Sequence, residues 1–206
     1  MTTAELNVDA ADLRALHPQL CNSFGERFAE VLQSRANNLE PWTKWYAAAD
    51  ATVWKTAAHE AGHTLAAYLR ADTLQLASAI PGNGSTGRTL YLRRSADVEE
   101  NIIGTLAGPM AEYLLAGSPL VLSMGEGGDG TKIVELLAEH DPTFTYQGGM
   151  ARSPLYLRAV PRAREFVEKF KRPISLLAVM IAEFGILSGS LIDQVFSTVE
   201  VDHADH

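Results

Sequence analysis

A chain of 206 residues, of which 47% are hydrophobic and 20% charged, has the composition of a globular protein with one domain or one domain plus an extension. Its formal net charge of -8 argues against a general binder of nucleic acid or acidic membranes, because contacts to phosphates need clustered Lys and Arg. The single cysteine, Cys21, excludes a disulfide framework and a cysteine-based metal site, and it suits the cytoplasm.

No segment of the sequence has the features of a membrane anchor or a secretion signal. The first residues lack a basic region followed by an apolar run, so we expect no signal peptide. The most apolar stretch, Ile174 to Leu187, is interrupted by Glu183 and is too short to span a bilayer. We therefore expect no integral membrane segment.

Most of the predicted elements are helices, indicated by apolar periodicity, high alanine content and capping residues. Ser95 and Asp97, the latter with Glu100 three residues later, are the candidate caps for the helix that ends near Ala116. The turn-rich residues 141–154 predict a loop. The predicted helices span residues 1–40, 48–70, 97–116, 131–140, 162–171, 174–185 and 190–199.

A short strand, loop and strand are predicted between the helices over residues 48–70 and 97–116. Residues 74–80 and 88–93 have strand-like sequence and flank the turn-forming cluster Pro81–Gly87. The expected fold is mainly α with a small β-hairpin or sheet. We divide the chain into an N-terminal helical extension over residues 1–47, a main domain over 48–200 and a tail over 201–206.

The predicted helix over residues 48–70 contains an HExxH motif, His59-Glu60-Ala61-Gly62-His63. Residues four apart lie on the same face of a helix, so both imidazoles can reach one metal ion. Glu60 lies about 100° further round the helix, where it can act as a general base on a metal-activated water. Two neutral imidazoles and a carboxylate suit zinc and leave a fourth position for water, whose pKa zinc lowers towards about 7.

Two features of the motif favour function over coincidence. With this composition, a chance HExxH is about a one-in-a-hundred event in a chain of this length. The motif also falls in a predicted helix, as the chemistry requires. Gly62 costs a helix about 1 kcal/mol relative to Ala, which indicates close packing or function at that point. The alternative is a helix with surface histidines.

A third protein ligand must come from a distant part of the chain. The extended motif HExxHxxGxxH is absent, because Ala66 occupies the position of its Gly. Glu112, in the helix after the hairpin, and Asp129, at the start of a helix, are the leading candidates. Asp129 could instead serve only as a helix N-cap. The other candidates are Asp97, Glu99, Glu100 and His140.

The glycine-rich segment Gly125–Gly130 is similar to a phosphate-binding loop, because an apolar stretch precedes it and a helix follows. The motif GxxxxGK[ST] would require Lys at position 131, where Thr131 stands, with Lys132 one residue late. No second acidic strand for magnesium is evident. A nucleotide-binding protein that uses Gly125–Gly130 is therefore the weakest of the functional hypotheses.

Further segments accompany the motif in a recognisable order and spacing. They are LASAIPG from Leu76, GRTLY from Gly87, IIGTLAGPMAEY from Ile102, GGDGTKI from Gly127, LLAVMIAE from Leu176 and LSGSLI from Leu187. Together with AAHEAGHTLAAYL, they resemble the peptidase domain of the FtsH-type AAA zinc metalloprotease family over about Ala48 to Val199. The resemblance implies an FtsH-peptidase-like helical zincin fold for residues 48–200.

The resemblance also implies a ligand set and an activity. The third zinc ligand of the family is the Asp of a Ser-Asn-Asp segment, which falls on Asp129, and Glu112 then looks like a helix Glu that orients a histidine. Gly128 and Gly130 flank Asp129 where the family has Asn and a larger apolar residue, and Pro109 replaces a family Arg. The implied activity is that of a zinc-dependent metalloendopeptidase.

The sequence departs from that family in lacking an ATPase module. Residues 1–47 are too few for one and contain no Walker A motif. We therefore expect a freestanding peptidase that acts on a peptide or unfolded protein, with a separate unfoldase or adaptor as a further partner. The hairpin edge along Arg88 to Leu92 is a candidate strand for binding an extended peptide. The alternative to an enzyme is a non-catalytic zinc module that binds a peptide or partner, and the oligomeric state stays open.

Overall fold

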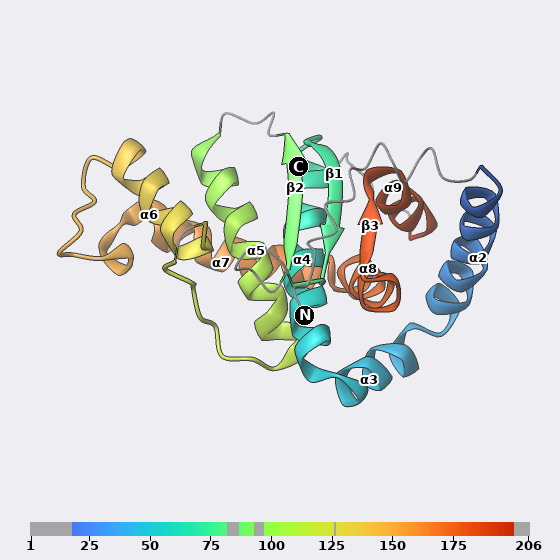
Figure 1. Cartoon of the computed structure of the whole chain (residues 1–206). Helices are drawn as coiled ribbons and strands as arrows, with labels where there is room; N and C mark the ends of the chain where they lie inside the picture. Colours follow the sequence, from blue (N-terminus) through green and yellow to red (C-terminus); the bar gives the residue numbers. More distant parts are fainter. Residues whose placement is uncertain (1–17, 82–86, 93–96, 126, 200–206) are drawn as a thin grey trace, which may run out of the picture.

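Helices form most of the chain, and a small antiparallel sheet lies beside them (Figure 1). The computed structural model describes residues 18–81, 87–92, 97–125 and 127–199, with side chains from residue 25 onward. The elements are α2 (Pro18–Asn37), α3 (Leu39–Ala49), α4 (Ala51–Leu69), β1 (Thr73–Ser78), β2 (Arg88–Leu92), α5 (Val98–Ala116), α6 (Asp129–His140), η1 (Met150–Arg152), α7 (Pro154–Lys169), α8 (Lys171–Phe184), β3 (Ile186–Ser188) and α9 (Gly189–Thr198). The expectation of a mainly α fold with a small sheet is confirmed.

The helix that carries HExxH, α4, lies between α5 and α8 in Figure 1 and packs against both. Its start is fixed by Asp50, whose side chain accepts hydrogen bonds from the backbone N–H groups of Thr52 and Val53, both at 3.0 Å. Alanines occupy much of its buried surface, so neighbouring helices can approach closely. The predicted helix over residues 48–70 is thus confirmed, and its motif lies near the middle of the fold.

The helices α4 and α5 approach each other closely at Gly62. A Cβ atom at this position would lie 2.3 Å from the carbonyl oxygen of Ala107 and 2.9 Å from the Cβ of Ala111. Gly108 makes the reciprocal contact, because its Cβ would lie 2.3 Å from His63 Nε2. The close packing that Gly62 indicates in the sequence is therefore confirmed, and it brings the backbone of α5 against the HExxH histidines.

The sheet has the strand order β2-β1-β3, and both pairings are antiparallel. Ala77 of β1 pairs with Thr89 of β2 on one side and with Leu187 of β3 on the other. The hairpin of β1 and β2 agrees with the sequence prediction, whereas β3 is an addition to it. Among the described residues β2 pairs only with β1, so it forms an edge of the sheet on the side of α4.

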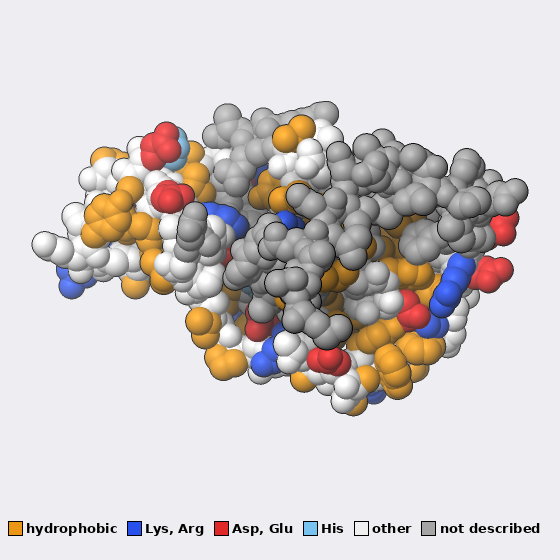
Figure 2. Space-filling view, in the orientation of Figure 1, with side chains coloured by type: hydrophobic (Ala, Val, Ile, Leu, Met, Phe, Trp, Pro, Cys, Tyr) orange, Lys and Arg blue, Asp and Glu red, His pale blue; other side chains and the backbone are white. Residues whose placement is uncertain are grey.

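The N-terminal helices share the main hydrophobic core of the molecule. Phe28 and Leu32 of α2 are buried together with Trp54 of α4 and Leu177 of α8. Figure 2 shows hydrophobic side chains on the surface over α3, and Trp45 of that helix is 55% exposed. The described part of the expected extension, residues 18–47, is therefore integrated into the fold.

A partly buried polar contact joins the N-terminal helices to α8. The carboxylate of Glu183 accepts a hydrogen bond from Arg35 at 3.0 Å and another from the hydroxyl of Tyr46. The guanidinium of Arg35 also lies 3.5 Å from the ring centroid of Trp42. Charge pairing and apolar packing therefore hold α2 and α3 to the rest of the chain.

A second hydrophobic cluster holds α6 in place. Its buried side chains include Ile102 of α5, Ile133 and Leu137 of α6, and Ala159 and Ala163 of α7. This cluster fixes the direction of α6, whose first residue is a candidate ligand. The position of that residue therefore depends on packing between helices that are distant in sequence.

Some helix ends differ from those predicted. The helix α7 begins at Pro154 instead of residue 162, because the hydroxyl of Ser153 accepts the backbone N–H of Tyr156 at 3.2 Å and Pro161 is tolerated inside the helix. Pro173, expected between two helices, lies in the first turn of α8. The tail over residues 201–206 lies outside the described residues. Within the part that is described, no helix combines the length and apolar character needed to cross a membrane.

Candidate metal centre

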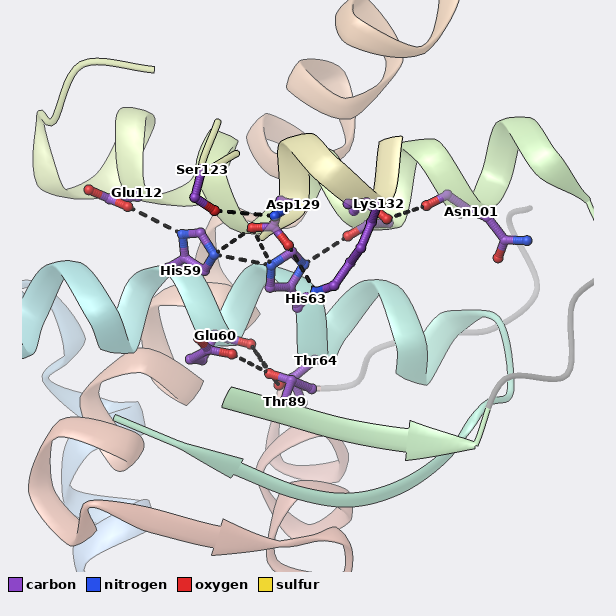
Figure 3. A network of polar contacts seen from close by, with 12 residues as sticks. His59, Glu60, His63, Thr64, Thr89, Asn101, Glu112, Ser123, Asp129 and Lys132 are labelled. Carbon is purple, nitrogen blue, oxygen red and sulfur yellow. Dashed lines mark hydrogen bonds and ion pairs between the residues drawn. The ribbon is translucent and has the colours of Figure 1, made fainter. Parts of the chain in front are cut away.

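His59 and His63, one turn apart on α4, meet Asp129 of α6 (Figure 3). The two Nε2 atoms lie 3.1 Å apart, and Asp129 Oδ2 is 3.0 Å from His59 Nε2 and 3.2 Å from His63 Nε2. We call these residues the His/Asp cluster. The structure thus brings together the two histidines of the motif and one of the two leading candidates for the third ligand.

The other nitrogen of each imidazole has an acceptor. His59 Nδ1 lies 3.2 Å from a carboxylate oxygen of Glu112, and His63 Nδ1 lies 3.0 Å from the carbonyl oxygen of Gly104. An Nδ1–H that donates to such an acceptor leaves the Nε2 lone pair facing the cluster, which is the usual arrangement around metal-binding histidines. Glu112 therefore lies on the opposite side of the His59 ring from Asp129, where it orients the imidazole.

The electrostatics of the cluster favour a cation at its centre. Burial disfavours the charged Asp129 carboxylate, but the adjacent His63 and His59 outweigh burial and hold its pKa far below the usual range. Burial lowers the pKa of His59. Its hydrogen bonds to Asp129 and Glu112 outweigh burial and raise the pKa to about 9. The Nε2 and Oδ2 lone pairs repel one another unless a proton or a metal ion lies between them.

The spacing and chemistry of the donors fit zinc. Ligands at the corners of a tetrahedron with bonds of about 2.0–2.1 Å lie about 3.3 Å apart. The contacts of 3.0–3.2 Å within the cluster are close to that spacing. Two imidazoles and one carboxylate are also the donor set of many catalytic zinc sites, which keep a fourth position open. The residues present therefore fit a zinc ion.

The start of α6 is held by the segment that precedes it. The backbone N–H of Asp129 donates to Ser123 Oγ at 3.2 Å, and that of Gly130 donates to the Ser123 carbonyl at 2.9 Å. A Cβ at Gly128 would lie 2.5 Å from the same carbonyl oxygen. These glycines thus allow the Ser123 segment to approach α6.

Asp129 lies in the first turn of α6 and is not its N-cap. Gly128 occupies the N-cap position and makes no side-chain capping hydrogen bond. The expectation that Asp129 could serve only as a helix cap is therefore wrong, because its carboxylate faces the histidines instead. Its second oxygen, Oδ1, accepts a hydrogen bond from Lys132 Nζ at 3.2 Å.

Glu60 points to the sheet side of α4, whereas the His/Asp cluster lies between α4 and α6 (Figure 3). Its side chain is buried, with 6% of the residue exposed. Glu60 Oε2 accepts a hydrogen bond from the hydroxyl of Thr89 on β2 at 2.8 Å. The candidate general base thus lies between the motif helix and the edge strand.

The remaining candidate ligands make other contacts. Asp97 caps α5 through the backbone N–H of Glu100 at 2.9 Å, as its position in the sequence predicts. Glu99 and Glu100 form ion pairs with arginines of α7, and the nearest charged partner of His140 among the described ion pairs is Glu139, at 3.6 Å. The structure does not bring these residues to the cluster.

The glycine-rich segment uses its backbone N–H groups internally. Gly128 donates to the Gly125 carbonyl at 2.9 Å, and the next two N–H groups bind the hydroxyl and carbonyl of Ser123. A phosphate-binding loop must direct such groups outward to its ligand. Residue 126 lies outside the described part, and the described part of this segment does not favour nucleotide binding.

Three residues that contact the candidate functional groups are not predicted from the sequence: Ser123, Gly104 and Thr89. Each acts through a backbone group or a single hydroxyl, and no spacing pattern marks such a residue. No protein-family model matches the chain, and no curated protein matches it. The functional argument therefore rests on the geometry of these residues.

Proposed function

We propose that this protein is a zinc-dependent metalloendopeptidase whose fold is similar to that of FtsH-type peptidase domains. His59, His63 and Asp129 would hold the zinc ion, and Glu60 would act as general base. The observation that carries the proposal is the convergence of three donor atoms, with each imidazole held by an acceptor on its other nitrogen. That arrangement suits metal binding better than it suits a chance group of polar side chains.

A zinc ion held by the His/Asp cluster would supply a Lewis acid, which would polarise the peptide carbonyl and lower the pKa of a bound water. Glu60 is the neighbour of His59 in sequence and also contacts the edge strand through Thr89. In the proposed mechanism this carboxylate would accept a proton from water and return it to the leaving amine. Burial of Glu60 excludes competing solvent from this carboxylate.

The edge strand β2 supports an extended polypeptide as substrate. Its outer edge has no partner strand among the described residues, so a peptide can add to the sheet by backbone hydrogen bonds. Leu90 and Leu92, which are 41% and 60% exposed, offer apolar surface on the same strand. An unfolded protein presents such extended segments directly, and a separate unfoldase or adaptor would supply them from folded proteins.

The substitution Glu60→Gln tests the proposal most simply. It keeps the shape of the side chain and removes its ability to accept a proton. We expect the variant to retain zinc and to lose chelator-sensitive cleavage of fluorescently labelled casein, an unfolded protein. Glu139→Gln, at an exposed position on α6, is the matched control and should cleave like the wild type. A fully active Glu60→Gln variant would refute the mechanism.

A non-catalytic zinc module that binds a peptide or partner is the second candidate. It is favoured by the orientation of Glu60, whose carboxylate is hydrogen-bonded to Thr89 and faces the sheet. Such a module would bind zinc through the same three residues and would turn over no substrate. Zinc-loaded wild-type protein that binds casein without cleaving it would support this candidate against the enzyme.

A further inference from the structure

The hydroxyl of Thr89 lies among three oxygen atoms on the sheet side of α4 (Figure 3). Its Oγ1 is 2.8 Å from Glu60 Oε2, 3.1 Å from the Glu60 carbonyl oxygen and 3.2 Å from Thr64 Oγ1. A threonine hydroxyl has one hydrogen and can donate it well to only one acceptor. The neighbouring groups therefore decide which oxygen receives it.

Thr64 settles the choice because its own hydroxyl donates to the Glu60 carbonyl at 2.6 Å. That carbonyl is then satisfied, and the hydrogen of Thr64 is in use. The carboxylate is the shortest contact of Thr89 and its only charged acceptor, and hydrogen bonds to charged acceptors are the stronger ones. The Thr89 hydroxyl therefore donates to the Glu60 carboxylate.

The start of β2 also confines the aliphatic part of Glu60. A Cβ atom at Gly87 would lie 2.9 Å from Glu60 Cγ and 2.5 Å from the Cγ2 of Thr56. A glycine is thus needed for the strand to lie this close to α4. Because the strand packs against the stem and donates to the head group, it limits the rotamers open to the Glu60 side chain.

We infer that Thr89 is a positioning residue, which fixes the Glu60 carboxylate on the sheet side of α4, beside the edge strand proposed to bind the peptide. The inference rests on the proposed peptidase function and adds one residue to it. In the proposed mechanism the carboxylate accepts a proton from water and later donates it to the leaving amine. The edge strand proposed to bind the peptide thereby also sets the position of Glu60, the group that protonates the leaving amine.

Three substitutions in the full chain test this role. Thr89→Val keeps the branched shape and removes the hydroxyl, Thr89→Ser keeps the hydroxyl, and Thr43→Val makes the same exchange at a partly exposed site on α3. Zinc content, melting temperature, and kcat and KM for labelled casein are measured for each. Since proton transfer depends on the position of the base, we expect Thr89→Val to lower kcat by about tenfold or more. Zinc content and KM should stay unchanged.

Thr89→Ser should restore most of kcat, and Thr43→Val should match the wild type. Wild-type kcat in Thr89→Val, or an equal loss in Thr89→Ser, overturns the inference while the peptidase proposal stands. If Thr89→Val fails to fold, Thr89→Ala compared with Thr89→Ser isolates the hydroxyl in the same way. Wild-type protein that holds zinc and cleaves nothing overturns the proposed function itself, and the role of Thr89 with it.

Discussion

The substitution Gly62→Ala probes the close packing of α4 and α5 on which the His/Asp cluster depends. The added Cβ would lie 2.3 Å from the carbonyl oxygen of Ala107, whereas ordinary C···O contacts begin at about 3.3 Å. The helices must therefore separate by about 1 Å. Overpacking of this kind costs about 3 kcal/mol, and the higher helix propensity of Ala offsets about 1 kcal/mol. We expect a net loss of about 2 kcal/mol in the free energy of unfolding.

A loss of that size lowers the melting temperature by about 4–8 °C in a chain of this length. Gly25→Ala, in α2, is the matched control, because no atom of the described residues lies within 4 Å of the position that its Cβ atom would take. It should raise the melting temperature by about 2–4 °C through helix propensity alone. Thermal unfolding followed by circular dichroism measures both. A Gly62→Ala protein that melts at or above the wild-type temperature would refute the packing argument.

Three other substitutions test further contacts. Gly108→Ala places a methyl group 2.3 Å from His63 Nε2, so we expect zinc affinity to fall by about tenfold or more in a chelator-competition titration. Ser123→Ala removes the acceptor that holds the backbone N–H of the acidic ligand at 3.2 Å, and zinc affinity should fall by about tenfold. Glu183→Gln removes the ion pair with Arg35 and should lower the urea midpoint at neutral pH.

The effect of Glu183→Gln should depend on pH in a defined direction. Burial raises the pKa of Glu183, but hydrogen bonds from Tyr46 and Arg35 outweigh burial and hold it below the usual value. The stability from this carboxylate is therefore present above about pH 4.3, its unfolded value, and is lost as the pH falls through the folded value. Urea midpoints of variant and wild type should converge in acid. A difference in urea midpoint that persists in acid would contradict this assignment to Glu183. Unchanged zinc affinity in Gly108→Ala or Ser123→Ala would contradict the contacts proposed for those two residues.

The sequence identifies the part of the site that is local. His59 and His63 depend only on the helical repeat, so their shared face is predictable from spacing and is observed. The third donor depends on how α6 packs against α5 and α7, and spacing alone does not decide between Glu112 and Asp129. The role of Thr89 is harder still to predict from the sequence, because its contact with Glu60 arises only when the sheet packs on α4.

The same distinction holds for the fold. Asp97 and the turn-forming glycine Gly117, which has a φ of 67°, mark the ends of α5 as the sequence predicts. In contrast, β3 has three residues, too few to show a period, and it pairs with β1 more than a hundred positions earlier. Local signals therefore define the helices, whereas tertiary pairing defines the third strand.

Zinc content of the purified protein, measured for the wild type beside Asp129→Ala and Glu112→Ala, tests the central claim most directly. We expect roughly one zinc ion per chain in the wild type. Asp129→Ala should lose most of its zinc affinity, while Glu112→Ala should weaken it by about 10–100-fold, since Glu112 only orients His59. Full zinc affinity in Asp129→Ala, or a wild type that binds no zinc, would contradict the proposed metal centre.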